Sequence, residues 1–179
     1  MVRPAYDEAL RRSGALEALA AFDPHVAGTP SLGLDLPASD IDILCHAPDL
    51  DAFAAVVEAV FGACDGFSVG RWGGGGGGAP AVVAGFAAHG WAFEVFGQAL
   101  PVAEQLGWRH FVVERRLMAL GGPALRVAVL RRRRAGLKTE PAFADVLRLT
   151  GDPYRAVLEL ECWTDEALAS LLAATASSR

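Results

Sequence analysis

The 179-residue sequence contains no asparagine, one lysine and two isoleucines. Alanine, glycine, arginine and proline are abundant instead, with 34, 20, 15 and 10 copies. GC-rich codons encode the abundant residues and AT-rich codons the scarce ones, so the bias indicates genomic drift rather than function. Arginine runs and glycine tracts therefore carry less functional weight than usual. The scarce residues carry more, and both isoleucines, Ile41 and Ile43, lie in one tetrapeptide.

Long hydrophobic runs and secretion signals are also missing. No apolar stretch reaches the roughly 20 residues that a bilayer-spanning helix needs. Residues 1–8 are charged and lack the apolar centre of a signal peptide. The three cysteines are odd in number and show no CxxC spacing, which is typical of reduced thiols in a cytoplasm. We therefore expect a cytoplasmic protein that does not engage a membrane.

Excess positive charge is absent as well, since the formal net charge is −5. An acidic chain is a poor candidate for indiscriminate nucleic-acid binding, so no general DNA binding is expected. The charge is uneven: residues 1–99 carry 4 basic and 12 acidic groups, whereas residues 100–140 carry 9 basic and 3 acidic groups. With this division, the acidic part could bind a cation and the basic part a polyanion beside it. Solvated helix faces are the alternative interpretation.

The order of the expected elements predicts an α+β fold with a mixed sheet in the N-terminal half, flanked by helices, and a helical C-terminal half. The length suits a single domain over residues 1–179, with a sheet-forming core at 1–100 and a helical part at 101–179. Six consecutive glycines, Gly73–Gly78, separate two strand-like segments and predict a flexible hairpin tip, with a lid over the substrate as the alternative.

Hydrophobic periodicity and turn residues place the individual elements. Helices are expected over residues 5–21, 50–61 (with Asp49 as N-cap), 102–119, 123–135, 141–149, 153–161 and 165–175. Strands are expected over residues 25–29, 32–36, 40–45, 67–72, 80–88 and 91–96, with the 32–36 segment as a half-buried strand or hairpin arm.

Two carboxylates stand two residues apart on the strand predicted at 40–45. Asp40 and Asp42 should project from the same face, since side chains alternate along a strand. Carboxylates that close repel one another unless a positive charge lies between them, and oxygen-only ligands favour Mg²⁺ or Mn²⁺ over Zn²⁺. Glu94, in an otherwise apolar strand, offers a third ligand. A solvated strand face is the alternative for Asp40 and Asp42 taken alone.

Upstream of these acids, Gly28 and Thr29 lie in a turn that leaves a predicted strand. Glycine permits close backbone approach to a ligand, and a threonine hydroxyl with exposed N–H groups suits phosphate oxygens. With Asp40-Ile41-Asp42-Ile43 and Glu94, this pattern resembles the nucleotidyltransferase superfamily of DNA polymerase beta. The second small residue is Thr29 here rather than glycine or serine, a departure that keeps the hydroxyl.

A closer resemblance, over nearly the whole chain, is to a bacterial domain-of-unknown-function family with a nucleotidyltransferase-like core. Its hallmarks match Gly28-Thr29, Asp40–Ile43, Phe93–Gln98, Arg109-His110 and Gly136–Phe143. The resemblance implies a nucleotidyltransferase-like fold and a plausible chemistry, and it specifies no substrate.

The resemblance implies in-line attack of an acceptor hydroxyl on the α-phosphorus of an NTP. Asp40 and Asp42 would hold the triphosphate-bound Mg²⁺ and share a second Mg²⁺ with Glu94. Gly28 and Thr29 would seat the phosphates that leave. The acceptor, on a small molecule, a protein or an RNA end, is open. Two alternatives also stay open: a catalytically silent module of this fold that binds a nucleotide or a partner protein, and one half of a toxin–antitoxin-like pair.

Three residues of the basic middle segment are further candidates. Lys138 is the only lysine, and a compact ammonium suits a triphosphate, although chance survival explains it equally well. Arg109 and His110 are placed at the rim of the nucleotide pocket, with an ordinary helix surface as the alternative. The run Arg131–Arg134 covers every face of a helical turn, so a mainly solvated face is expected, with one or two of these residues aimed at phosphate or a partner as the alternative.

Overall fold

The structure is a computed structural model that describes residues 3–73 and 79–176. The chain divides into two compact units: residues 1–31 with 37–108, and residues 32–36 with 109–179. The change of unit after Trp108 lies close to the change of character predicted near residue 100, and the single domain stays a prediction. Of the glycine tract expected at a hairpin tip, Gly74–Gly78 lies outside the described residues.

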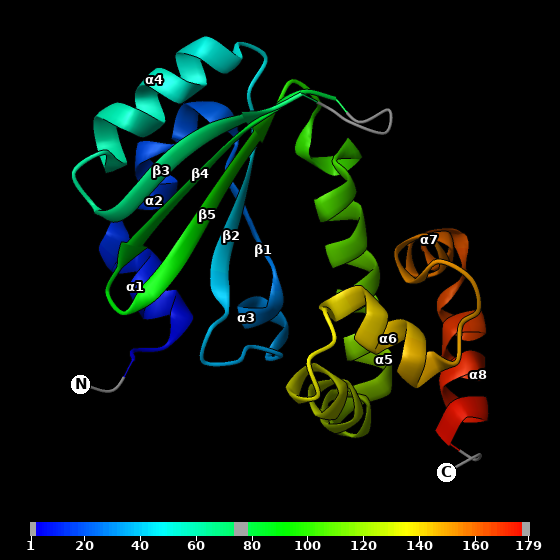
Figure 1. Cartoon of the computed structure of the whole chain (residues 1–179). Helices are drawn as coiled ribbons and strands as arrows, with labels where there is room; N and C mark the ends of the chain where they lie inside the picture. The colour runs from blue at the N-terminus through cyan, green and yellow to red at the C-terminus, as the bar shows by residue number, and fades with distance from the viewer. Residues whose placement is uncertain (1–2, 74–78, 177–179) are drawn as a thin grey trace. The chain divides into compact units, whose positions relative to one another are not determined.

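The first unit contains a five-stranded mixed sheet (Figure 1). Its strands are β1 (His25–Ala27), β2 (Asp40–His46), β3 (Asp65–Trp72), β4 (Ala81–Ala88) and β5 (Trp91–Gln98). Their spatial order is β1-β2-β5-β4-β3, and only β2 and β5 run parallel. The turn between β4 and β5 has positive φ at His89 and Gly90, as a two-residue hairpin turn requires. The expected hairpin at this position is therefore confirmed.

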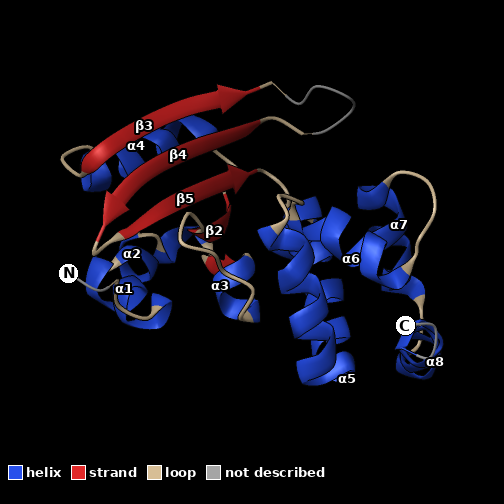
Figure 2. Ribbon diagram, turned by 60° about the horizontal axis from the view of Figure 1, so that its bottom comes forward, coloured by secondary structure: helices blue, strands red, loops and turns tan. Residues whose placement is uncertain are grey.

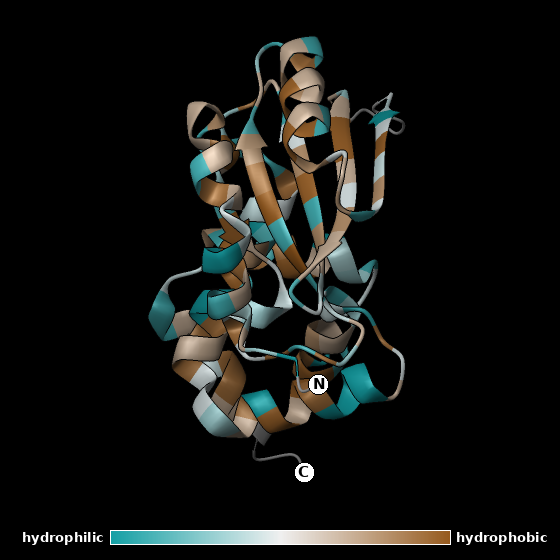
Figure 3. Cartoon of the chain, turned by 90° about the vertical axis from the view of Figure 1, so that its left-hand side faces the viewer, coloured by the Kyte–Doolittle hydropathy of each residue, from teal (hydrophilic) through white to brown (hydrophobic). Residues whose placement is uncertain are grey.

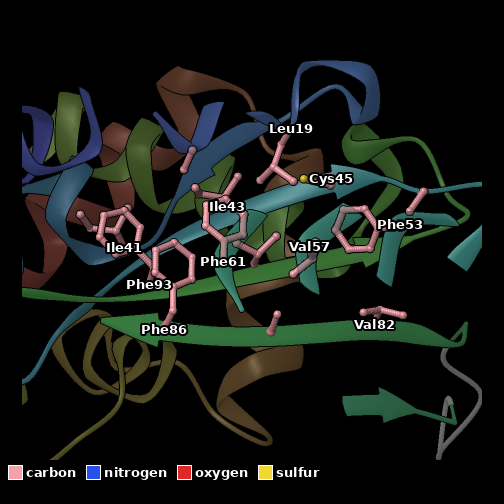
Figure 4. Packing of buried hydrophobic residues seen from close by; sticks show 14 of the residues in the cluster. Leu19, Ile41, Ile43, Cys45, Phe53, Val57, Phe61, Val82, Phe86 and Phe93 are labelled. Atoms are coloured by element: carbon pink, nitrogen blue, oxygen red, sulfur yellow. The ribbon is translucent and has the colours of Figure 1, made fainter. Parts of the chain in front are cut away.

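Helices α1 (Tyr6–Ser13), α2 (Ala15–Ala18) and α4 (Leu50–Phe61) pack on one face of this sheet (Figure 2). The buried cluster between them includes a stack of three phenylalanine rings. The ring of Phe86 lies between those of Phe61 and Phe93, with centroid distances of 4.4 and 4.8 Å (Figure 4). In Figure 3 brown, hydrophobic segments alternate with white and teal ones along several strands, as expected for a sheet with one packed face.

Helix α4 begins where the sequence predicts. Asp49 Oδ1 accepts hydrogen bonds from the backbone N–H groups of Asp51 and Ala52, at 3.0 and 2.9 Å. This cap satisfies donors that the first helical turn leaves without partners. One turn apart, Phe53, Val57 and Phe61 are buried against the sheet.

Two local predictions were wrong. The helix expected over residues 5–21 is interrupted at Gly14, which has φ of +64° and ends α1; α2 and a 3-10 helix, η1 (Ala20–Phe22), follow. The strand expected over residues 32–36 does not exist. Instead, Leu32 is the last residue of a one-turn helix, α3 (Thr29–Leu32). Gly33, with φ of +66°, ends that turn. Leu34 is fully buried without belonging to a strand.

The second unit is helical. Helix α5 (Leu106–Arg134) starts in the first unit and continues into the second, and α6 (Thr139–Leu147), α7 (Pro153–Glu159), a 3-10 helix η4 (Leu160–Cys162) and α8 (Asp165–Ala176) follow. Gly122, with φ of +57° and ψ of −150°, breaks the helical path inside α5 just before Pro123. The predicted break between two helices is therefore real.

These elements confirm the α+β class, with a mixed sheet in the N-terminal half and helices in the C-terminal half. Within the part of the chain that the structure describes, no helix combines the length and apolar character needed to cross a bilayer.

Candidate functional site

The predicted carboxylates lie on the face of the sheet opposite α1, α2 and α4. On β2, Ile41 and Ile43 are fully buried in the core, so the alternate residues Asp40 and Asp42 project from the other face, where both are half-buried. Asp42 is in register with Glu94 on the neighbouring parallel strand β5, and Glu94 is exposed. Backbone pairing therefore places all three acids on one face of two adjacent strands.

Gly28 lies directly against the Asp42 carboxylate. Ala27, the last residue of β1, is in register with Asp42, and Gly28 follows with φ of +77°. A Cβ atom at position 28 would come within 1.9 Å of Asp42 Oδ2, so no side chain fits there without displacing the carboxylate. Both the backbone conformation and the close approach require glycine.

Thr29 is only 9% exposed, and its hydroxyl donates a hydrogen bond to Ser39 Oγ at 3.2 Å. This contact connects the turn after β1 to the residue that precedes Asp40. The Arg3 guanidinium holds the same segment from outside, donating to the backbone oxygen of Pro37 at 2.9 Å while it stacks on the ring of Trp91. The structure thus gives the Thr29 hydroxyl a positioning contact, and its role toward phosphate stays a prediction.

The donor set on this face fits a hard divalent cation. Asp40, Asp42 and Glu94 offer only carboxylate oxygens, which Mg²⁺ and Mn²⁺ prefer. Among the residues described, no three His, Cys, Asp or Glu side chains are gathered closely enough to form a metal-binding group. Strand register brings Asp42 and Glu94 to neighbouring positions, and the joint coordination of a metal ion by the three carboxylates stays a prediction.

Cys45, on β2 with the two aspartates, belongs to the opposite, helix-covered face of the sheet. Cys45 points into the core and is fully buried. Burial raises the pKa of its thiol to about 12, with a further contribution from the negative charge of Asp23. A thiol held neutral in this way is inert near neutral pH.

Arg109 and His110 belong to the second unit, where each contacts another helix. The Arg109 guanidinium donates from Nε and Nη2 to the Glu161 carboxylate, at 3.1 and 2.5 Å. These hydrogen bonds, reinforced by charge attraction, raise the pKa of Arg109 and lower the pKa of Glu161. His110 Nε2 lies 2.9 Å from the carbonyl oxygen of Tyr154. Both residues therefore join α5 to α7 and η4, and their predicted contact with a nucleotide stays a prediction.

Lys138 is exposed and immediately precedes α6 in the second unit. In the arginine run, Arg132 forms an ion pair with Asp145 at 2.5 Å, and Arg133 donates to the hydroxyl of Thr139. These contacts connect the end of α5 to α6. Part of the run is therefore structural rather than simply solvated.

Three residues near this face have contacts that the sequence did not predict. Ser39 is buried beside Asp40 and accepts the hydrogen bond from Thr29, but a lone serine in a loop gives no pattern. Gly97 and Gln98 are the last two residues of β5. A Cβ at Gly97 would lie 2.3 Å from the Phe53 ring, and Gln98 Nε2 donates to the carbonyl of Ala79. Both positions thus serve packing at the end of β5.

Comparison with solved structures identifies the fold. A chain of the GLD-2/RNP-8 complex superposes with a TM-score of 0.53 and 12% sequence identity, covering 88% of this chain and 61% of that one. Cid1, described by its RNA terminal uridylyl transferase activity, superposes with a TM-score of 0.52 and 16% identity, covering 85% of this chain and 46% of that one. The chain thus spans about half to three fifths of these relatives. The nucleotidyltransferase-like fold expected from the sequence is confirmed.

No curated protein matches the sequence significantly. A family profile does match, over residues 8–160, and its description is "Domain of unknown function (DUF4269)". The match includes every residue of the acid-bearing face and most of the helical unit. This chain is a member of the DUF4269 family.

Proposed function

We propose that this protein is a metal-dependent nucleotidyltransferase that transfers an NMP group from an NTP to a hydroxyl group of an acceptor. The acceptor is a small molecule, a protein or an RNA end. The observation that carries this proposal is the placement of Asp40, Asp42 and Glu94 on one face of two adjacent parallel strands, with Gly28 against Asp42. The nucleotidyltransferase-like fold of the chain supports the same proposal.

In the proposed enzyme, Asp40, Asp42 and Glu94 hold Mg²⁺ or Mn²⁺ through their carboxylate oxygens. A bound divalent cation would neutralise triphosphate charge and lower the pKa of the attacking hydroxyl. The glycine at position 28 leaves room for the Asp42 carboxylate, and the backbone of the turn that begins there is proposed to contact phosphate oxygens. The link between Thr29 and Ser39 keeps that turn close to the start of β2.

Cationic groups for the phosphates are proposed to come from Lys138, Arg109 and His110. Lys138 is exposed and carries a compact charge suited to phosphate oxygens. Arg109 is already engaged by Glu161, so phosphate would have to compete with that carboxylate. For this reason Lys138 is the stronger candidate of the three.

The activity in the description of Cid1 supports an NTP as donor and makes an RNA end one candidate acceptor. Because this chain spans 46% of Cid1 at 16% identity, the activity transfers to it only as part of the proposal. A cytoplasmic location, also proposed, would give access to NTPs and to each of the three acceptor classes.

The test measures transfer of label from α-labelled NTPs to components of a cell lysate in the presence of Mg²⁺. Wild type is compared with the Asp40→Asn/Asp42→Asn double variant, for which we expect a loss of about a thousandfold, equivalent to about 4 kcal/mol of transition-state stabilisation. The matched control is the double variant Asp51→Asn/Asp65→Asn. It removes the same number of charges from exposed positions of the same unit, away from the site, and should keep wild-type activity.

Calorimetry with Mg²⁺, Mn²⁺ and each NTP separates the remaining possibilities. If wild type binds neither metal nor nucleotide, the proposed site is wrong. Nucleotide binding without transfer to any lysate component would favour the silent binding module instead. Transfer to one protein only would favour the toxin–antitoxin-like pair.

A further inference from the structure

Asp23 and His25 form a side-chain pair at the start of β1. His25 Nε2 lies 3.0 Å from Asp23 Oδ1. Because a carboxylate only accepts hydrogen bonds, the shared hydrogen belongs to Nε2. In the neutral ring, Nδ1 then keeps a lone pair that can take up a proton. A carboxylate that fixes the tautomer of an imidazole in this way prepares the ring as a proton acceptor.

Strand register places His25 on the acid-bearing face of the sheet. In the antiparallel pair of β1 and β2, His25 is opposite Leu44 and Ala27 is opposite Asp42. Opposite residues of such a pair project from the same face, and Val26 between them packs against the core on the other face. His25 is therefore a diagonal neighbour of Asp42. The backbone positions of diagonal neighbours in an antiparallel pair are about 7–8 Å apart.

The surroundings of His25 orient its ring while leaving it accessible. The Trp108 ring packs edgewise against it, with a centroid distance of 5.0 Å and an interplanar angle of 66°. The side chain of His25 is 39% exposed and that of Asp23 is 68% exposed. A polar pair this exposed contributes little to stability. The titratable groups that described contacts and register place around His25 are Asp23, adjacent, and Asp42 and His46, its two diagonal neighbours on β2; Leu44 and Trp108 are uncharged.

We infer that His25, oriented by Asp23, accepts the proton of the acceptor hydroxyl in the transfer reaction. The inference rests on the proposed function. The acceptor oxygen forms a bond to the α-phosphorus as its O–H proton passes to His25 Nδ1. The bond from the α-phosphorus to the bridging oxygen of the β-phosphate breaks, and its electron pair leaves with pyrophosphate. The imidazolium then releases its proton to solvent, which its 39% exposure permits.

Substitutions at His25 test the assignment through the pH dependence of the rate. The assay measures label transfer from α-labelled NTPs to one lysate preparation over about pH 5 to 9, the range in which an imidazole titrates. We expect His25→Gln to lower kcat about a hundredfold near neutral pH, to leave KM for the NTP unchanged and to abolish the acidic limb of the profile. Asp23→Asn should lower kcat in the same direction, because an amide does not fix the tautomer in the same way.

A matched control is His89→Asn, in the turn between β4 and β5, where asparagine tolerates the left-handed backbone (φ of +52°). It should keep the wild-type rate and profile. Imidazole added to His25→Ala should restore part of the rate, which a merely structural role of His25 would not allow. Thermal unfolding verifies that each variant is folded before its rate is compared.

Three outcomes would overturn the assignment. A wild-type rate in His25→Gln would exclude a proton-accepting role. A lower rate with an unchanged acidic limb and no rescue by imidazole would make His25 structural. If wild type itself transfers no label, the proposed function fails, and the role of His25 fails with it; that outcome is recognised without any variant at position 25.

Discussion

Successive residues of β2 show how differently the two faces of the sheet are used. Ile41 and Ile43 project into the cluster beneath α1, α2 and α4, where neither is exposed to solvent. Asp40 and Asp42, one residue away along the same strand, project from the opposite face and keep partial contact with water. One face therefore lowers the free energy of the fold by burying apolar area, while the other carries the groups proposed for chemistry.

Stability and activity should therefore respond to substitutions on different faces of the sheet. Substitutions on the helix-covered face should lower stability. Those on the acid-bearing face should change activity with little effect on stability, except where backbone geometry is involved. Four variants test this separation.

The largest effect on stability is expected for Phe93→Ala. Phe93 is 2% exposed and stacks on Phe86, so truncation leaves a cavity and should cost about 3–5 kcal/mol. Urea denaturation measures the change. The control is Glu94→Gln, one residue along β5 but on the other face, which should stay within about 0.5 kcal/mol of wild type and lose transferase activity. Equal destabilisation by both variants would contradict the division between the faces.

Gly28→Ala should combine a loss of stability with a loss of activity. The left-handed backbone at position 28 strains any residue with a Cβ, and that atom would meet Asp42 Oδ2. We expect a loss of about 2 kcal/mol, measured by thermal unfolding, and activity reduced as far as in a direct Asp42 variant. Gly14→Ala isolates the backbone contribution, because φ there is +64° and no atom lies within 4 Å of the added Cβ. Equal effects at the two positions would show that the approach of Asp42 is unimportant.

Asp49→Ala tests whether local capping on the helix-covered face acts independently of the site. Loss of the two capping hydrogen bonds of α4 should cost about 1 kcal/mol with unchanged activity. Asp51→Ala removes an exposed partner of Arg71 instead and should cost less. Chemical denaturation distinguishes the two, and a larger effect at Asp51 would reverse the expectation.

Glu161→Gln gives the smallest expected effect and extends the comparison to the second unit. Hydrogen bonds from Arg109 lower the pKa of Glu161 in the folded state, so its stabilising contribution is present above the ordinary glutamate pKa. That contribution is lost as pH falls through the lowered value. Because the pair is partly exposed, we expect a difference of no more than about 1 kcal/mol at neutral pH, shrinking on acidification.

Urea midpoints at neutral and acidic pH measure this difference. Glu159→Gln is the control, because its pair with Arg155 is more exposed and should contribute less. A difference for Glu161→Gln that grew as pH fell would contradict the assigned direction of the pKa shift.

Strong local patterns in the sequence predicted much of this molecule correctly. Alternation from Asp40 to Cys45 predicted β2, and Asp49 before an apolar helical stretch predicted the start of α4. Asp40 and Asp42 could be proposed as site residues because an acid–hydrophobic–acid–hydrophobic pattern is local too. Alternating leucines at residues 32–36 predicted a strand wrongly, because alternation reports which side chains are buried and not whether a neighbouring strand pairs with them.

The sequence by itself determined most of the elements and the α+β class, and it singled out the three acids as candidates, since hydrophobic periodicity and short motifs are local patterns in the chain. Only the tertiary structure decided that Asp42 lies beside Glu94, that Gly28 meets the Asp42 carboxylate, and that His25 shares their face. It also decided that Arg109 pairs with Glu161, 52 residues away. These relations depend on strand register and helix packing between distant segments, which are fixed by the burial of a common core and leave no periodic signal in the chain.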